Sequence, residues 1–438
     1  MNLSIGIDIG TTSLCAVVLD TDERKVLKAV TVSNGTDIPG EFPWQRCQQP
    51  DVIVEKCKTI LDPLLDEFGP VQTIGVTGQM HGILYYDAEG TAVSKLYTWQ
   101  DESGNQLHES GKKWAEYLSE VTGYALASGF GCVTHACNMA AGLVPEQAVG
   151  FCTVHDYLVM VMTGRKTPLC HATDAASFGL YDLQKQCFDG EAVVASGIDP
   201  AMLPETTDDR VQAGTYRGIG VYTAIGDNQA SFLGAVKDVR EGVLLNIGTG
   251  SQVSVMVEAP VKAENAETRP FLKGSYLMVG ASLCGGRAYA ALEGFFRSFA
   301  EAAGFGGQQY DLMGRLAREA MTTSKEEKLR VDTRFCGTRR DSRIRGSVEN
   351  LSLENLTPPH LICGFLEGTV EELYGFYREA EPMVRDRARV LVGSGNGLRR
   401  NLLWQQIAQK RFDLPLEMSD VPEEAACGAA IFGAGTYA

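Results

Sequence analysis

Two stretches decide the fold of this chain: "IGIDIGTTSLCAVVLD" (residues 5–20) and "VLLNIGTGSQVSVMVE" (residues 243–258). In each, apolar β-forming residues flank a short turn of glycine and threonine, which predicts two strands joined by a tight turn. Both stretches contain "IGT", and they stand slightly more than half the chain apart. We therefore predict a duplicated α/β fold, with one hairpin at the start of each half and a boundary close to residue 235.

The segments around the hairpins contain both helical and strand patterns. Residues 50–68, 285–304 and 358–381 show apolar residues at helical spacing. Residues 71–90 predict a strand, a polar turn and a second strand, and residues 389–410 predict a strand, a glycine-rich loop and a helix.

Composition excludes several classes of protein. The 438 residues are 44% hydrophobic and 21% charged, which is ordinary for a globular chain and argues against disorder, collagen or a coiled coil. The net charge of −16 argues against a nucleic-acid or acidic-membrane partner. The N-terminus lacks a signal-peptide pattern and no apolar stretch approaches the ~20 residues that span a bilayer. We expect a cytoplasmic enzyme whose twelve cysteines are reduced.

The two glycine-threonine turns are either ordinary tight turns or sites for anionic oxygens. Successive backbone N–H groups in such turns form a concave nest, and the hydroxyls of threonine and serine add donors. Asp8 lies beside the first turn and could hold Mg²⁺ through water. No P-loop motif occurs, and "GSGNG" (393–397) is too short for a Rossmann fingerprint, although it would let a purine nucleotide approach the backbone.

Asp227 lies in "TAIGDNQASFLGA" (223–235), between a short apolar run and a stretch of small and apolar residues. One interpretation is a helix N-cap, whose side chain accepts a hydrogen bond from a backbone amide. The other is a general base that takes a proton from a substrate. The stretch alone does not decide between them.

Two polar turns are candidates for binding a polyol. "GQMHG" (78–82) places Gln79, Met80 and His81 at the end of a predicted strand, where α/β proteins often place ligand contacts. "TWQDE" (98–102) offers the ring of Trp99 for C–H faces and the carboxylate of Asp101 for hydroxyl groups. Both could equally be surface turns.

Two further clusters have weaker functional interpretations. "CVTHAC" (132–137), with Cys152 and His155, could form a zinc site, but its spacing fits neither a usual finger nor a catalytic site, so we expect buried thiols. The basic run "TRRDSRIRG" (338–346) is either a solvated loop or a segment in which one arginine steers a phosphate.

The motifs "GIDIGTTS", "GQMHG", "TWQD", "GDNQAS", "NIGTGS" and "VGSGNG", in this order, resemble the FGGY family of carbohydrate kinases. The resemblance covers nearly the whole chain. It implies duplicated actin-like ATPase domains of the ribonuclease-H type that flank a catalytic cleft. It also implies a sugar-binding domain over residues 1–235 and a nucleotide-binding domain over residues 236–438, with ATP and Mg²⁺ as cofactors.

The resemblance, together with the polar turns, assigns expected roles to individual residues. Asp227 matches the catalytic base, and Asp8 matches the acid associated with Mg²⁺. The expected sugar ligands are Gln79, Met80, His81, Trp99, Asp101 and Asn228. The expected phosphate-loop residues are Gly10, Thr11, Thr12, Ser13, Gly248 and Thr249, and the expected adenosine-loop residues are Gly393, Ser394, Gly395 and Asn401.

The expected reaction is phosphorylation of a ketose at its terminal primary hydroxyl. Segments 123–139, 173–183 and 334–352 look most like the sedoheptulose kinases of the family, and xylulose kinases are the alternative. An actin-like ATPase without a sugar substrate is a more distant alternative, and a zinc hydrolase the most distant. The expected partners are a small sugar and MgATP, with neither nucleic acid nor membrane, in a monomer or homodimer. One departure is Cys15, which stands where many members carry Lys or Arg.

Overall fold

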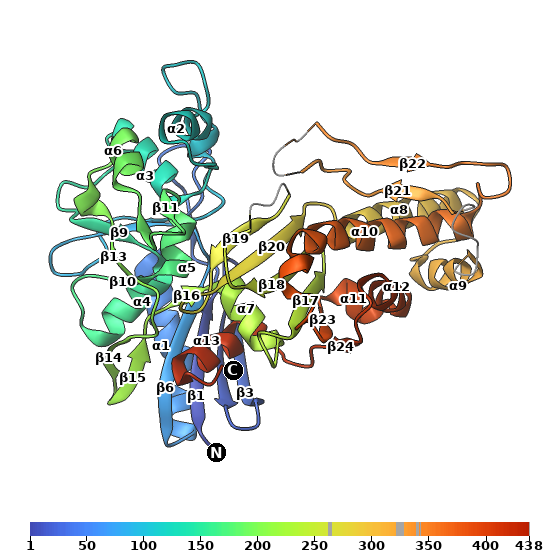
Figure 1. The fold of residues 1–438 in the computed structure, drawn as a ribbon. Helices are drawn as coiled ribbons and strands as arrows, with labels where there is room; N and C mark the ends of the chain where they lie inside the picture. The colour runs from blue at the N-terminus through green and yellow to red at the C-terminus, as the bar shows by residue number, and fades with distance from the viewer. Residues whose placement is uncertain (262–264, 321–327, 339–340, 342, 438) are drawn as a thin grey trace. The chain divides into compact units, whose positions relative to one another are not determined.

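The computed structural model describes residues 1–261, 265–320, 328–338, 341 and 343–437. Within these residues the chain forms two compact units (Figure 1). The first unit comprises Met1–Lys237, Arg269–Ser275 and Val421–Ala438, and the second comprises Asp238–Thr268 and Tyr276–Asp420. The sequence-based division at residue 235 assigned the two later segments of the first unit to the other half. A hydrophobic pattern shows that a segment is buried, but it does not show against which sheet the segment packs.

The first unit is built around one sheet. Its main elements are β1 (Leu3–Ile9), β2 (Ser13–Asp20), β3 (Lys25–Ser33), α1 (Pro50–Glu67), β6 (Val71–Gly78), β14 (Gln212–Tyr216), β15 (Ile219–Tyr222), β16 (Ile225–Gly226), α7 (Asp227–Ala235) and α13 (Glu424–Ala434). β1, β2 and β3 are antiparallel neighbours, whereas β6 runs parallel to β1, and β15 and β16 run parallel to β6. The first predicted hairpin is therefore confirmed.

The other elements of the first unit are shorter and connect these main strands. They are β4 (Asp37–Ile38), β5 (Cys47–Gln48), β7 (Leu84–Tyr86), β8 (Leu96–Tyr97), η1 (Ser103–Asn105), α2 (Trp114–Thr122), α3 (Gly131–Ala140), β9 (Gly150–Cys152), α4 (Val154–Thr163), β10 (Leu169–His171), α5 (Ala172–Ala175), η2 (Ala176–Phe178), β11 (Tyr181–Asp182), β12 (Cys187–Phe188), α6 (Gly190–Ala195), η3 (Pro200–Met202) and β13 (Glu205–Thr207).

The second unit has its own sheet, which contains the second predicted hairpin. Its elements are β17 (Gly242–Ile247), β18 (Ser251–Val257), β20 (Tyr276–Ser282), α8 (Gly286–Ala302), α9 (Tyr310–Ala320), β21 (Arg330–Asp332), β22 (Ser347–Glu349), α10 (Pro358–Val384), β23 (Val390–Ser394), α11 (Asn396–Arg400), α12 (Leu402–Phe412) and β24 (Leu416–Met418). A short strand, β19 (Glu267–Pro270), spans a boundary between the two units.

The two sheets share one topology. The strand order is β3-β2-β1-β6-β15 in the first sheet and β20-β18-β17-β23-β24 in the second. In each, three successive strands are antiparallel, and the fourth and fifth run parallel to the first. The duplication predicted from the two hairpins is therefore confirmed at the level of the whole sheet.

The central strands β1 and β2 of the first sheet are buried on both faces, which explains their nearly continuous apolar residues. α1 contributes buried side chains such as Ile53, Cys57 and Leu61 to one core cluster with β1 and β6. α13 contributes to another cluster with β2 and lies beside β1, β6 and α7 (Figure 1). These helices complete a three-layer arrangement in this unit.

α13 approaches the strands so closely that only glycine fits beneath it. A Cβ atom at Gly6 of β1 would lie 1.8 Å from the carbonyl oxygen of Ala426. The same helix meets α7 equally closely, because a Cβ atom at Gly428 would lie 1.7 Å from the carbonyl oxygen of Ala230. Backbone-to-backbone packing therefore fixes the position of α7, whose first residue is Asp227.

The predicted helices over 50–68, 285–304 and 358–381 are confirmed as α1, α8 and α10. For residues 389–410, the prediction of a single helix after the glycine-rich loop is wrong. The structure forms two helices there, α11 and α12, which are separated at Asn401. Asn401 has an extended backbone, with φ −121° and ψ 94°, and its side chain caps α12. A capping residue inside an otherwise helical pattern therefore ends one helix and starts the next.

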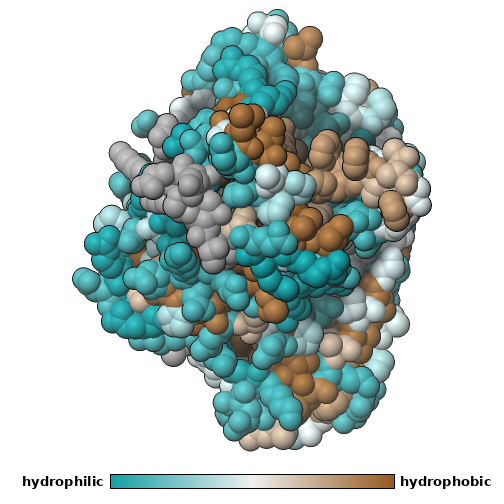
Figure 2. All heavy atoms as spheres, turned by 90° about the vertical axis from the view of Figure 1, so that its right-hand side faces the viewer, coloured by the Kyte–Doolittle hydropathy of each residue, from teal (hydrophilic) through white to brown (hydrophobic). Residues whose placement is uncertain are grey.

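The surface carries scattered apolar side chains. In the second unit, Phe295 and Phe299 of α8 and Leu353 are exposed. The face in Figure 2 shows hydrophobic patches separated by hydrophilic side chains. Isolated exposed apolar groups are normal on folded proteins, so we assign them no binding role. In the described part of the chain, no helix is long and apolar enough to cross a membrane.

We expect Gly428→Ala to destabilise the chain by about 1–3 kcal/mol, because the new methyl group overlaps backbone atoms that have little room to move. Gly294 of α8 is the matched control, since a Cβ atom there meets nothing within 4 Å. Gly294→Ala should be neutral or stabilise by up to about 1 kcal/mol. Denaturant unfolding of both variants measures the difference, and a Gly428→Ala variant as stable as the original chain would contradict the packing argument.

Candidate active site

The carboxyl ends of three strands meet at one edge of the first sheet. Ile9 of β1 pairs with Gly78 of β6, and Gly78 pairs with Gly226 of β16, with all three strands parallel. Asp8 precedes the first of these residues and Asp227 follows the last. In parallel sheets this edge is where ligands bind, so the topology brings together the first glycine-threonine turn, the "GQMHG" turn and Asp227.

Asp227 is the first residue of α7, and Gly226 is the N-cap. Asp227 therefore does not occupy the N-cap position, and the N-cap interpretation of Asp227 is wrong. Its Oδ1 atom lies 3.4 Å from Nδ2 of Asn228, and the side chain is partly exposed. Burial raises the pKa of Asp227, while Asn228, Arg269 and His155 oppose this increase. The carboxylate is therefore both accessible and more basic than an ordinary aspartate.

Asp8 lies on β1, and its Oδ1 atom is buried without a hydrogen-bond partner among the described residues. Burial raises the pKa of Asp8 to about 7, with further contributions from the negative charges of Asp227 and Glu423. An unpaired carboxylate oxygen beside other carboxylates fits a site that receives a cation. No group of three His, Cys, Asp or Glu side chains in the described residues could hold a metal alone. Asp8 therefore fits a Mg²⁺ ion that brings other ligands, as MgATP does.

The first turn is fixed by hydrogen bonds at both ends. Nδ2 of Asn34 donates to the carbonyl oxygen of Gly10 at 2.8 Å, and the backbone N–H of Asn34 donates to the carbonyl oxygen of Thr12 at 2.9 Å. Ser13 begins β2 directly after this turn. The structure thus places the predicted phosphate-loop residues of the first unit in one ordered turn beside Asp8.

A ring of polar groups joins this turn to the predicted sugar ligands. The Thr11 hydroxyl donates to Oε1 of Gln79 at 3.2 Å, and Nε2 of Gln79 donates to Oε1 of Gln48 at 2.9 Å. Nε2 of Gln48 closes the ring by donating to the Thr11 carbonyl oxygen at 2.9 Å. Nε1 of Trp99 donates to the Thr11 hydroxyl, also at 2.9 Å. The expected phosphate turn and the expected sugar turns therefore hold each other in place; Gln48 was not predicted.

The other two residues of the "GQMHG" turn also pack against the site. A Cβ atom added at Gly226, the residue directly before Asp227, would lie 2.7 Å from the Sδ atom of Met80, so the two residues pack closely. His81 has a left-handed backbone with φ 72°, lies 2.7 Å through Nδ1 from the carbonyl oxygen of Ser177, and stacks on Phe130 at 4.7 Å. These contacts fix the orientation of both side chains.

Asp101 has one oxygen to offer a ligand. It is 1% exposed, and its Oδ1 atom accepts a hydrogen bond from the backbone N–H of Ser103 at 2.9 Å. Its Oδ2 atom is buried and has no partner among the described residues. Burial also raises the pKa of Asp101. An unpaired buried oxygen of this kind is suited to accept a hydrogen bond from a sugar hydroxyl.

The second unit contains a cavity of about 770 Å³ beside its own glycine-threonine turn. The backbone N–H of Gly248 donates to the carbonyl oxygen of Gly250 at 2.9 Å, and that of Arg287 donates to the carbonyl oxygen of Thr249 at 3.2 Å. The second of these hydrogen bonds fixes the start of α8 against the turn. The described lining residues include Gly248, Thr249, Gly286, Arg287, Tyr289, Tyr310, Asn396, Arg400, Asn401 and Trp404.

Three of the nucleotide-site residues predicted for this unit, Gly248, Thr249 and Asn401, line the cavity. Gly393, Ser394 and Gly395 are not among its described lining residues. Gly395, with φ 85°, lies against the backbone of Ile247, and the hydroxyl of Ser394 accepts a hydrogen bond from Asn246 at 3.1 Å. These residues support the loop, while Asn396 and Gly397, which follow them, line the cavity.

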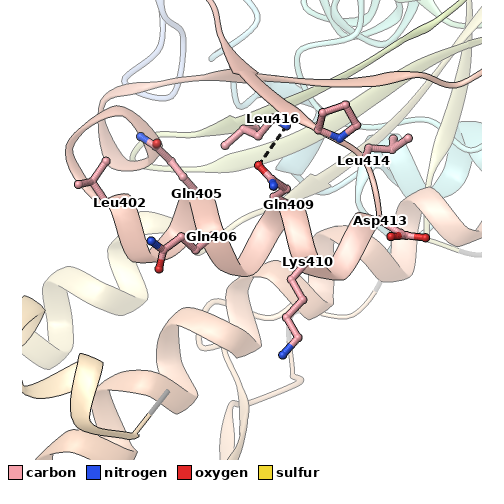
Figure 3. A pocket seen from close by; sticks show the side chains of 9 residues that line it. Leu402, Gln405, Gln406, Gln409, Lys410, Asp413, Leu414 and Leu416 are labelled. Atoms are coloured by element: carbon pink, nitrogen blue, oxygen red, sulfur yellow. Dashed lines mark hydrogen bonds between the residues drawn. The ribbon is translucent and has the colours of Figure 1, made fainter. Parts of the chain in front are cut away.

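A second hollow in this unit, of about 600 Å³, lies between α12 and β24 (Figure 3). Gln409 points toward β24, and its Oε1 atom accepts a hydrogen bond from the backbone N–H of Leu416 at 3.4 Å, whereas Lys410 points away. The hollow has no glycine-rich turn among its described lining residues. We assign it no role in the reaction.

Cys15, the cysteine and histidine cluster at 132–137 and the basic run at 338–346 are the remaining candidates from the sequence. Burial raises the pKa of the Cys15 thiol to about 12, so Cys15 supplies no charge. Nδ1 of His135 lies 2.9 Å from the hydroxyl of Tyr85, and Cys132 and Cys137 are buried, as expected for buried thiols. In the basic run 338–346, positions 339, 340 and 342 lie outside the described residues; Arg343 is exposed and pairs with Asp341 at 2.9 Å.

Comparison with known proteins identifies the family. Residues 3–244 match the N-terminal domain of the FGGY family of carbohydrate kinases, and residues 243–437 match its C-terminal domain. Sedoheptulokinase of Mus musculus is 28% identical over 98% of this chain and 96% of the mouse protein. Xylulose kinase of Lactococcus lactis is 24% identical over 100% of this chain and 89% of that protein. The structure of xylulose kinase from Rhodospirillum rubrum, 20% identical, has a TM-score of 0.82 over 99% of this chain and 89% of its own.

The chain therefore belongs to the FGGY family of carbohydrate kinases. This confirms the resemblance inferred from the ordered motifs, the carbohydrate kinase activity and the duplicated actin-like fold. ATP is the phosphate donor that family membership implies.

We expect Asp8→Asn to raise the melting temperature, and to raise it more at pH 8 than at pH 5. The pKa of Asp8 is raised in the folded chain from 3.8 to about 7, so the unfolded chain loses this proton at lower pH. Stability therefore falls as pH rises between these two values, and asparagine removes this loss. Thermal unfolding in EDTA-containing buffer measures the effect without bound metal.

Asp22→Asn is the control for Asp8→Asn, because its effect on stability at pH 8 should have the opposite sign. Hydrogen bonds from Asn2 and the N-terminal amine lower the pKa of Asp22, so its contribution to stability is present above its ordinary pKa. This variant should lose stability at pH 8. An Asp8→Asn variant no more stable than the original chain at pH 8 would contradict the assignment of an unfavourably buried carboxylate.

Proposed function

We propose that the chain transfers the γ-phosphate of ATP to the terminal primary hydroxyl of sedoheptulose, giving sedoheptulose 7-phosphate, with Asp227 as general base. The observation that carries the catalytic part is the position of Asp227 as the first residue of α7, at the edge of the sheet that also carries the first glycine-threonine turn and its polar ring around Thr11. The choice of sugar rests on the similarity to mammalian sedoheptulokinases over 98% of the chain.

The chemistry requires little covalent participation by the protein. The hydroxyl must be aligned with the γ-phosphorus, the developing charge must be stabilised, and one proton must be accepted. Asp227 accepts that proton, and its partial burial makes it a stronger base than a fully solvated aspartate. Asp101 and Asn228 orient the sugar hydroxyls. Mg²⁺, held near Asp8, would neutralise charge on the phosphates.

In this proposal the cavity of the second unit binds the nucleotide. The rings of Tyr289 and Trp404 lie 5.0 Å apart and offer apolar surface for a purine. Arg287 and Arg400 add positive charge, and the turn at Gly248 and Thr249 offers backbone amides for phosphate.

A screen for sugar-dependent ADP release tests the substrate. We expect sedoheptulose to give the highest kcat/KM among sedoheptulose, D-xylulose, D-ribulose, L-ribulose, gluconate and glycerol. D-Xylulose as the best substrate would support the alternative function, a xylulokinase. ADP release that no sugar stimulates would support an actin-like ATPase. Cytoplasmic location and a monomeric or homodimeric state, both expected from the sequence, stay predictions.

We expect Asp227→Asn to lower kcat by about 10²- to 10⁴-fold, since it removes the proton acceptor. Binding of ATP and sugar, measured by calorimetry, should be retained because asparagine keeps the size and polarity of the side chain. Asp182→Asn, at a half-buried carboxylate of β11 that pairs with Lys185, is the matched control and should keep full activity. Turnover of Asp227→Asn within a few-fold of the original chain would contradict the role of Asp227.

A further inference from the structure

A buried ion pair lies beside the strand ends of the first unit. His155 of α4 and Asp174 of α5 are in contact through Nε2 and Oδ1 at 2.9 Å, and neither side chain has any exposed area. Sequence reasoning considered His155 only as a zinc ligand and did not single out Asp174. Burying two charged groups is costly unless they serve each other or a neighbour, so this pair requires an explanation.

The imidazole lies against the central residue of the strand ends. A Cβ atom at Gly78 would lie 2.9 Å from Nδ1 of His155, so only glycine leaves room for the ring. Gly78 pairs with Ile9 on one side and with Gly226 on the other. The next residue after Gly226 is Asp227. The ring is therefore placed at the strand position adjoining the proposed base.

α5 links the ion pair directly to the start of α7. Asp174 binds His155, and one residue earlier the hydroxyl of Thr173 accepts a hydrogen bond from the backbone N–H of Gly226 at 3.1 Å. Nδ1 of His171 lies 3.0 Å from the same hydroxyl. A single short helix thus holds both the counter-ion of His155 and the backbone that carries Asp227.

The surrounding charges favour a protonated histidine. Burial alone lowers the pKa of His155, but the carboxylates of Asp174, Asp156 and Asp227 raise it to about 9. Other titratable or charged groups of this cluster are Asp8 of β1, Cys152 of β9, Cys170 and His171 of β10, Arg269 of β19, and Glu423 before α13. The cluster is rich in carboxylates, so loss of one internal cation leaves them less compensated.

We propose that His155, held by Asp174, is a positioning residue whose buried positive charge stabilises the carboxylate form of Asp227 and so keeps the base ready for phosphoryl transfer. This inference rests on the function proposed above. His155 touches no substrate; it acts through Asp227. The contact of His155 with Gly78 and the hydrogen bond from Gly226 to Thr173 hold the His155 ring at a fixed separation from Asp227.

The test is the pH dependence of kcat for His155→Gln and His155→Lys. For the glutamine variant we expect the acidic limb to move up by about one pH unit, because removing a nearby cation raises the pKa of the base. Its kcat should be up to about tenfold below the original on the acidic side of the profile and should recover by pH 9, with KM for ATP unchanged. His155→Lys should restore the original limb. An unmoved limb in His155→Gln would overturn the proposal.

His135→Gln is the matched control. His135 is also buried and packs against Tyr85, but burial lowers its pKa to about 4, so it carries no charge at neutral pH. This variant should lose stability and keep the original acidic limb. A shift of the limb in this variant would show that any buried histidine substitution moves the profile, which would also overturn the proposal.

Two measurements keep the test decisive if His155→Gln does not fold. Asp174→Asn removes the counter-ion and should move the limb in the same direction. In the original chain, ¹⁵N NMR of the histidine rings should show one buried ring still protonated at pH 8; only neutral buried rings at that pH would overturn the proposal. The NMR result does not depend on activity. If every sugar failed in the screen, the proposed function would be rejected, but the NMR spectra would still show whether His155 is protonated.

Discussion

The close packing of α13 against glycines of β1 and α7 is the constraint on which the first unit depends. Backbone atoms meet at distances that admit no side chain at Gly6 or Gly428. This contact fixes β1, which carries Asp8, and α7, which begins with Asp227, relative to one helix. Side chains adjust by rotating, whereas a backbone contact cannot. The geometry of the two carboxylates is therefore set by main-chain contact rather than by the residues that surround them.

The hairpins, the duplication and most helices could be predicted because they depend on local patterns. Apolar runs around a glycine-threonine turn specify a strand pair without reference to the rest of the chain. The "GQMHG" turn could be singled out in the same way. The proposal that Asp227 is the base needed the order of all the motifs, since its own neighbours slightly favoured a cap. In the structure Gly226 takes the cap position, and Asp227 is the first residue of the helix.

Other features could not be predicted because they arise from tertiary contacts. His155 and Asp174 lie on different helices, and nothing in the local sequence of either indicates the other. Tyr289 and Trp404, more than a hundred residues apart in the chain, meet in one cavity. The division of a helix at Asn401 depends on a cap that competes with helix continuation. In each case a long-range partner decides what a local pattern leaves open.

The assignment of Val421–Ala438 to the first unit makes the second unit an insertion between α7 and α13. During synthesis, the sheet of the first unit emerges from the ribosome long before the helix that covers one of its faces. Domains usually fold in order from the N-terminus. Here the first unit must wait, with one apolar face open, until the inserted unit has been translated. A chain whose translation stops early would therefore lack a complete first unit. The proposed catalytic site can form only after both units have been translated.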